Sequence, residues 1–345
     1  MHPAASATLA TAAALVCAAP VVARDAANDA HWKSPRTEHG HPDLQGVWTS
    51  ATITPLERPD QFGDRLVITE VEARQLESAE ADYNAAADAP SDLSKPAAAT
   101  CRSGSGPTCG YNNFWIDRGS QVVTIDGERR SSLIVDPANG KIPLTTERRQ
   151  RLAERMRSMR QNFDGPEARP LGERCLLAFG SSSGPPMLPV LYNNHYQIVQ
   201  TKDAVVILVE MVHDARIIRL NGKPAPESIP KWMGDSAGRW EGDTLVVDTR
   251  NFTDREGFRG GTLEATIVER FRRVASDKIE YRFTIDDPNA FTQPWTGEIP
   301  FYRTDNPIYE YACHEGNYAL PGILAGAREE EKAGLAGADR DLRAQ

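Results

Sequence analysis

Two histidines of this chain each stand directly before a carboxylate. His213 precedes Asp214, and His314 precedes Glu315. A neutral imidazole accepts a proton near neutral pH, and a neighbouring carboxylate can orient the ring and stabilise its charged form. The two pairs therefore predict a site for proton transfer.

The residues around the pairs suggest how the roles would divide. We expect His213 to act as the general base with Asp214 orienting it, and either His314 or Tyr311 to act as the acid. Arg216 would hold an anionic group of the substrate through two parallel hydrogen bonds. The structural alternative is a turn ion pair between Asp214 and Arg216 with His213 packed beneath it.

A third polar and aromatic group lies earlier in the chain. Tyr192, Asn193 and His195 follow one another closely, and Tyr and Asn side chains at a rim are suited to bind a sugar or a phenol. Asn317 lies just beyond the second histidine pair and is a further candidate for substrate binding. The same residues would equally serve as turn and strand-edge residues.

A metal centre is the competing chemistry for the two histidines. His213, His314 and one carboxylate would make a three-ligand site with an open position. Neither histidine, however, has another histidine two or four residues away, and the two are about a hundred residues apart. We therefore expect neither a metal nor another cofactor.

The first residues have the composition of an export signal. The run from Ala10 to Val22 is uncharged and rich in small apolar residues, and cleavage after Ala23 would fit the small residues before it. Residues 1–23 are therefore expected to be a signal peptide and the protein to be periplasmic or secreted. No later run has the length of a membrane span.

Four cysteines remain after such a cleavage, and an even number in an exported chain favours two disulfides. Three pairings are possible. Cys101 and Cys109 flank a short flexible loop that closes at little entropic cost, which leaves Cys175 to pair with Cys313. The second bond would tie the end of the chain, and His314 with it, to the middle.

Bulk composition narrows the class of partner. The 345 residues are 40% hydrophobic and 25% charged, which is enough apolar material for a core. The net charge of −9 argues against nucleic acid or an anionic membrane as a partner. A small-molecule ligand or substrate is the expected partner.

The second half of the chain has the pattern of a β meander. Short runs with apolar residues at alternate positions are separated by turn residues, among them the pair Gly242 and Asp243. The main runs are residues 196–200, 204–211, 215–220, 244–249, 266–274, 278–285 and 295–303. Together they predict a mainly β fold, a lipocalin-like antiparallel β-barrel. The Gly46-x-Trp48 tripeptide is also the pattern that opens lipocalin barrels, where the Trp fills the closed end.

Two helices interrupt the first half. A capping box opens the run 69–87, and an arginine-rich run covers 145–163. No repeat or long linker divides the chain. We therefore expect one barrel domain with helical insertions over residues 24–330, followed by a C-terminal tail over 331–345.

Four segments resemble a family of uncharacterised exported bacterial proteins. They are Met211-Val-His-Asp-Ala-Arg-Ile-Ile-Arg-Leu, Gly238-Arg-Trp-Glu-Gly-Asp-Thr-Leu-Val-Val-Asp, Phe291-Thr-Gln-Pro-Trp-Thr and Cys313-His-Glu-Gly-Asn-Tyr-Ala-Leu. The resemblance implies a lipocalin-like (calycin) barrel and carries no reaction with it.

Function must therefore be argued from the residues. The first hypothesis is a periplasmic enzyme that performs acid–base chemistry, as a lyase, isomerase or hydrolase, on a small apolar or aromatic metabolite. The alternative is a non-catalytic ligand carrier or accessory protein. Because ligands enter barrels at their mouths, we expect His213 and His314 to face one cavity, with Asp214 or Glu315 hydrogen-bonded to one of them.

Overall fold

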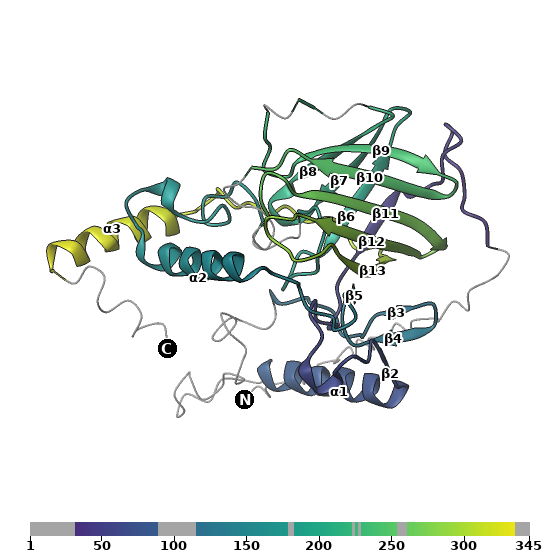
Figure 1. Ribbon diagram of the computed structural model, residues 1–345, viewed down its shortest axis with the longest axis horizontal. Helices are drawn as coiled ribbons and strands as arrows, with labels where there is room; N and C mark the ends of the chain where they lie inside the picture. The colour runs from purple at the N-terminus through teal and green to yellow at the C-terminus, as the bar shows by residue number, and fades with distance from the viewer. Residues whose placement is uncertain are drawn as a thin grey trace, which may run out of the picture.

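The computed structural model describes residues 32–88, 115–178, 183–222, 225–226, 229–253 and 261–334. The expected signal peptide and the expected Cys101–Cys109 bond lie outside the described residues. Figure 1 shows a β-barrel with two helices extending from one side and a small sheet with a third helix below it.

Nine strands within the described residues close into the barrel. They are β1 (Gly46–Thr49), β6 (His195–Gln200), β7 (Ala204–Val209), β8 (Ala215–Leu220), β9 (Asp235–Glu241), β10 (Thr244–Arg250), β11 (Thr266–Ala275), β12 (Lys278–Asp286) and β13 (Trp295–Arg303). β1 pairs with both β6 and β13, which closes the ring. Neighbouring strands are antiparallel except β8 and β9, which pair in parallel over two residues. The expected mainly β barrel is confirmed.

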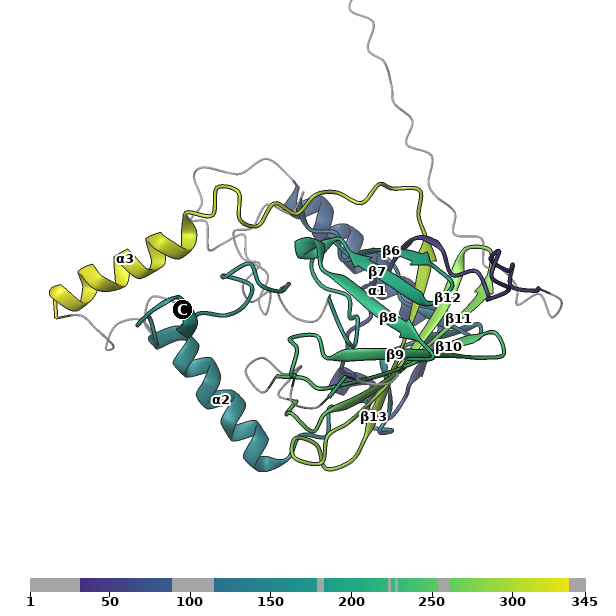
Figure 2. The same cartoon turned by 90° about the horizontal axis from the view of Figure 1, so that it is seen from above.

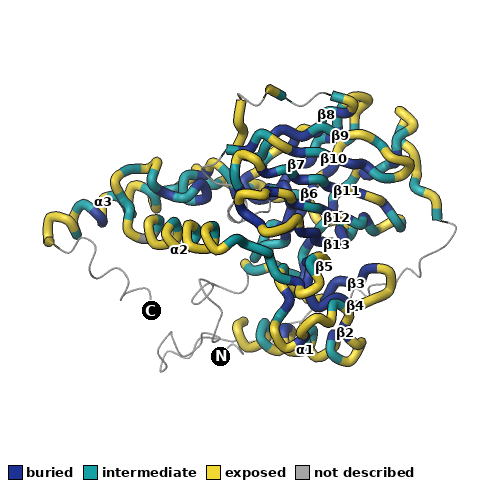
Figure 3. Tube along the Cα trace, viewed as in Figure 1, coloured by how far each residue is buried: buried dark blue, intermediate teal, exposed yellow. Residues whose placement is uncertain are grey.

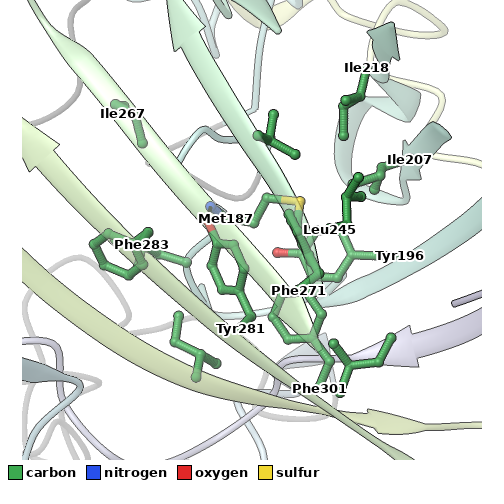
Figure 4. Close-up of a cluster of buried hydrophobic side chains, with 14 of the residues drawn as sticks. Met187, Tyr196, Ile207, Ile218, Leu245, Ile267, Phe271, Tyr281, Phe283 and Phe301 are labelled. Carbon is green, nitrogen blue, oxygen red and sulfur yellow. Dashed lines mark hydrogen bonds between the residues drawn. The ribbon is translucent and has the colours of Figure 1, made fainter. Parts of the chain in front are cut away.

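Alternation along the strands decides which side chains enter the barrel. On β12, for example, Ile279, Tyr281, Phe283 and Ile285 are buried, and the residues between them are more exposed. The inward side chains form one large apolar cluster. Its aromatic rings are packed closely, as Figure 4 shows, with the ring of Tyr281 5.0 Å from that of Phe301. Burial of this apolar surface is the main stabilising contribution to the fold.

One end of the barrel is closed around Trp48, which is fully buried. Its indole nitrogen donates to the carbonyl of Leu44 at 2.9 Å, and the guanidinium of Arg273 lies 5.4 Å from its ring centre. Arg273 also donates to the Asp43 carbonyl at 2.9 Å. The Gly-x-Trp tripeptide thus has the end-closing role expected of it, because a large ring and a cation fill the space between the strand ends.

A small unit packs beside the barrel. It contains β2 (Val67–Ile68), β3 (Thr124–Ile125), β4 (Glu128–Arg130) and α1 (Glu70–Ala87), with a short 3-10 helix, η1 (Asp60–Phe62). Thr69 and Glu72 form the expected capping box at the start of α1. β5 (Ile134–Asp136) joins this part of the chain to β13 of the barrel.

Two further helices, α2 (Thr146–Gln161) and α3 (Ala319–Lys332), extend away from the barrel (Figures 1 and 2). The short 3-10 helix η5 (Pro166–Ala168) follows α2 in the sequence, and η6 (Met211–His213) forms the turn between β7 and β8. α2 lies where the arginine-rich run predicted a helix, and α3 begins before the expected tail. Figure 3 shows that α2 is largely exposed. Among the described residues, no helix combines the length and apolarity that crossing a bilayer requires.

Candidate functional site

Some of the sequence-predicted site residues, among them His213, Asp214 and Tyr311, lie at the open end of the barrel. Three segments meet there, and we call them together the mouth: residues 183–195, 210–214 and 309–313. Ser183 donates to Asp214 at 2.7 Å, and the amide of Tyr309 donates to Glu210 at 3.0 Å. These contacts hold the loop before β6 and the segment after β13 against the turn between β7 and β8.

Three non-glycine residues of the mouth have a positive φ. Val212 has φ 61°, and His213 beside it has φ 45°. Asn193, in the loop before β6, has φ 56°. A positive φ is an outlier for a β-branched valine and costs on the order of 1–3 kcal/mol. Strain of this kind persists only where the surrounding contacts enforce it, and it is typical of functional sites.

His213 is exposed, and its ring is held by the main chain of the neighbouring segment. Its Nδ1 lies 3.2 Å from the carbonyl oxygen of Tyr311. Because a carbonyl can only accept, Nδ1 carries a hydrogen, and in the neutral form of the ring the lone pair is on Nε2. Orientation of the ring, which we expected from Asp214, thus comes from Tyr311.

Asp214 has a different partner. Its carboxylate accepts from Ser183, and its burial raises the pKa of the carboxyl group against the lowering effects of Ser183 and His213. The expected hydrogen bond between this carboxylate and the imidazole of His213 is therefore replaced by a bond to the loop before β6.

His195 and Glu210 form a second pair that the sequence did not suggest. Nδ1 of His195 lies 3.0 Å from a carboxylate oxygen of Glu210, and both residues are buried. The hydrogen bond raises the pKa of His195 against the effect of burial. For Glu210, burial raises the pKa, but His195, the Tyr309 amide and Asn193 together lower it more. Both shifts favour an imidazolium–carboxylate pair.

Arg216 is not placed to hold a substrate at the mouth. It lies inside the barrel, 3% exposed, and its two terminal nitrogens donate to Glu269 at 3.0 and 2.6 Å. Tyr281 donates to the same carboxylate at 2.8 Å, and its oxygen accepts from the Met187 amide at 3.0 Å. The proposed bidentate grip on an anionic substrate is therefore wrong, because Glu269 already occupies both nitrogens.

The residues around His314 do not all face one site. A groove of about 480 Å³ is lined by Tyr311, Glu315 and Asn317 among others, but by neither His213 nor His314. His314 and Glu315 are both exposed. This groove is therefore not the cavity that we expected the two histidines to share.

The predicted bond between Cys175 and Cys313 is confirmed, with the two Cα atoms 5.6 Å apart. It fixes the segment that supplies Tyr311, and Asn317 lies against it with its amide 3.3 Å from the sulfur of Cys175. Tyr192 and Tyr311 pack on the apolar cluster formed by Ala178, Met211 and Val212. The mouth therefore has an apolar, partly aromatic lining around its polar groups.

Metal binding gains no support from the placement of these residues. Across the described ranges, no group of three or more His, Cys, Asp or Glu side chains is placed to hold an ion. The site consists instead of one exposed histidine, one buried histidine–carboxylate pair and the polar cluster beneath them.

Comparison with known proteins adds little to this picture. No family model matches the chain, and no curated protein matches it. Among solved structures, a match is to a mutant of the fluorescent protein UnaG, with 12% identity, a TM-score of 0.21, and coverage of 32% of this chain and 72% of that one.

Proposed function

We propose that the protein is an exported enzyme that performs acid–base chemistry on a small apolar or aromatic metabolite at the mouth of the barrel. The observation that carries the proposal is the state of His213. Its Nδ1–H is fixed by the Tyr311 carbonyl at 3.2 Å, and the residue is exposed. A neutral imidazole held in one tautomer with Nε2 free is prepared to take a proton from a bound molecule.

We assign the proton donor to His195, which begins β6 beside this turn. Its hydrogen bond with Glu210 raises the pKa of the imidazole and so favours the charged form. The backbone joins the two histidines: the amide of His213 donates to the Glu210 carbonyl at 3.3 Å, and the amide of Glu210 donates to the His195 carbonyl at 3.0 Å. A base and an acid joined through the backbone of Glu210 are the minimum set for a lyase, isomerase or hydrolase.

The lining of the mouth supports an apolar or aromatic substrate. Tyr192 and Tyr311 pack against Met211 and Val212, so a flat apolar molecule would contact rings and aliphatic groups. Export is supported by the Cys175–Cys313 bond, since disulfides form and persist in oxidising compartments.

The test pairs two exposed histidines. The purified protein is incubated with a metabolite extract and depleted compounds are followed by mass spectrometry. His213→Gln should abolish the depletion, whereas His314→Gln, an exposed histidine outside the mouth, should preserve it. Equal activity of both variants would exclude His213 as the base.

The alternative function is a non-catalytic ligand carrier. In that case a compound would be retained by the protein without being converted, and His213→Gln would leave its retention unchanged. The same extract distinguishes the two functions, because a carrier changes the amount of bound compound and an enzyme changes its mass or structure.

A further inference from the structure

The interior of the barrel contains polar atoms that its own structure leaves without partners. Among the described residues, no hydrogen-bond partner is present for Nε of Arg216, and the hydroxyls of Tyr196 and Ser50 have no partner other than each other. These residues are 3%, 0% and 1% exposed. Two hydroxyls that bond to each other still leave one hydrogen to donate, and a buried donor without a partner costs about 1–3 kcal/mol, so two such donors in one place require an explanation.

The three groups face one another. A hydrogen bond with the Ser50 hydroxyl and the charge of Arg216 both lower the pKa of Tyr196, against the larger effect of burial, which raises it to about 12. Tyr196 is the second residue of β6 and Arg216 the second residue of β8. Both strands start at the mouth, so the group lies just beneath it.

Met187 lies beside Tyr196 and Tyr281 in the barrel core (Figure 4). It is fully buried, and its amide donates to Tyr281 at 3.0 Å (Figure 4). It belongs to the loop before β6, not to a barrel strand. The unbranched side chain of methionine adapts easily to irregular space, and the loop holds it there from outside the sheet.

We propose that the barrel beneath Met187 is a binding site for the oxygen-bearing end of a small neutral molecule, and that Met187 fills this site when the molecule is absent. The ligand's oxygen would accept from Nε of Arg216 and from the Tyr196 or Ser50 hydroxyl. Its apolar body would take the volume of the Met187 side chain among the aromatic residues of the core.

The charges already present in the site favour a neutral ligand over an anionic one. The charge of Arg216 is already matched by Glu269 at 2.6 Å, so an added anion would be buried without a counter-charge. A carbonyl, phenol or ether oxygen satisfies the free donors without adding charge. The ligand class is therefore a neutral, largely apolar compound with one oxygen at its end.

The interior site extends the proposed function. Only the statement that its ligand is also the substrate rests on that function. Arg216 follows His213 by three residues, so one turn and the strand after it carry both the imidazole and the interior site. A molecule that reaches from the interior site to the mouth would place its oxygen at Arg216 and its other end at the imidazole. Binding is measured without turnover, so failure of one proposal leaves the other open to its own test.

The experiment compares 2-naphthol with naphthalene, which share size and shape and differ by one oxygen. Met187→Ala should bind 2-naphthol at least about tenfold more tightly than naphthalene, because a hydrogen bond to otherwise unpaired buried groups is worth about that factor. Tyr196→Phe in the same background should reduce the preference. Ile68→Ala, which opens space in the separate cluster around α1, is the matched control and should show no preference.

Equal affinity of Met187→Ala for the two compounds would overturn the proposal, because a merely apolar cavity does not distinguish them. A measurement on the wild-type protein covers the case in which the variant fails to fold. Hydrogen exchange of the Met187 amide should accelerate when 2-naphthol binds, since the ligand displaces this amide from Tyr281. Unchanged exchange at saturating 2-naphthol contradicts displacement of Met187.

Discussion

The barrel interior and the mouth use charged residues in opposite ways. Inside, Arg216 and Glu269 are buried and hold each other by two hydrogen bonds, with Tyr281 as a third member. At the mouth, His213 is exposed, its ring makes one hydrogen bond among the described residues, to Tyr311, and its backbone is strained. The interior pair can be disturbed only at a cost to the fold, whereas the mouth histidine is available to a ligand.

The difference indicates where stability and where chemistry are to be sought. A buried ion pair contributes little net stability because its desolvation cost offsets the attraction, yet loss of one partner is severe. An exposed histidine on a strained turn contributes few core contacts. Variants of the two regions should therefore separate into those that change the free energy of unfolding and those that change activity.

The largest effect should come from breaking the interior pair. Glu269→Leu leaves the guanidinium of Arg216 buried without a counter-charge, and we expect the free energy of unfolding to fall by about 3–5 kcal/mol. Denaturant titration measures it. The matched control is the double variant Arg216→Met with Glu269→Leu, which removes both charges. It should be more stable than the single variant, and the opposite order would mean that the pair is not the source of the loss.

Loss of the disulfide should have the next largest effect, because this bond links the mouth segment that carries Tyr311 to Cys175 in the middle of the chain. Cys175 and Cys313 are separated by 138 residues, and the bond restricts the unfolded chain over that length. Replacing both with serine should lower the free energy of unfolding by about 2–4 kcal/mol. The loss should be accompanied by faster hydrogen exchange at Tyr309 and Tyr311. Unchanged exchange there would show that other contacts hold the segment.

Local features were predictable from the sequence because their causes act over a few residues. Thr69 and Glu72 are three residues apart, and their capping box places the start of α1. Gly242 and Asp243 form the expected turn between β9 and β10, with Gly242 at φ 61°. The Cys175–Cys313 bond was predictable because four cysteines allow only three pairings.

The site was only partly predictable because its contacts join distant strands. Glu269 occupies an inward position of β11, where alternation gave a possible signal, but nothing in the sequence indicates that it faces Arg216 of β8. The partner of His195 is Glu210, 15 residues away across a strand pair. Tyr309 and Tyr311 reach the mouth on a segment without periodicity, so no local pattern could place them.

The histidine–carboxylate pair should show a pH-dependent effect. The pKa of His195 is raised above 6.5 and that of Glu210 lowered below 4.5 in the fold, so their contribution is complete between about pH 4.5 and 6.5. It decreases as His195 loses its proton at higher pH and as Glu210 gains one at lower pH. His195→Gln should therefore cost on the order of 1 kcal/mol more at pH 5.5 than at pH 9.

Thermal denaturation of the wild type and His195→Gln at both pH values measures this difference. His314→Gln, at an exposed position, is the control and should change stability equally at the two values. A His195→Gln penalty that does not vary with pH would mean that the pair is neutral, and it would remove His195 as the proposed proton donor.

The smallest effect on stability should come from the residue with the largest proposed effect on activity. His213 is exposed and makes one side-chain hydrogen bond, to Tyr311 at 3.2 Å, so His213→Gln should change the free energy of unfolding by no more than about 0.5 kcal/mol. Its turnover should nevertheless be lost, because glutamine cannot take up a proton. Activity and melting temperature are measured on the same preparation. If the loss of activity follows the loss of stability, His213 supports the strained turn and the interior and the mouth no longer differ in role.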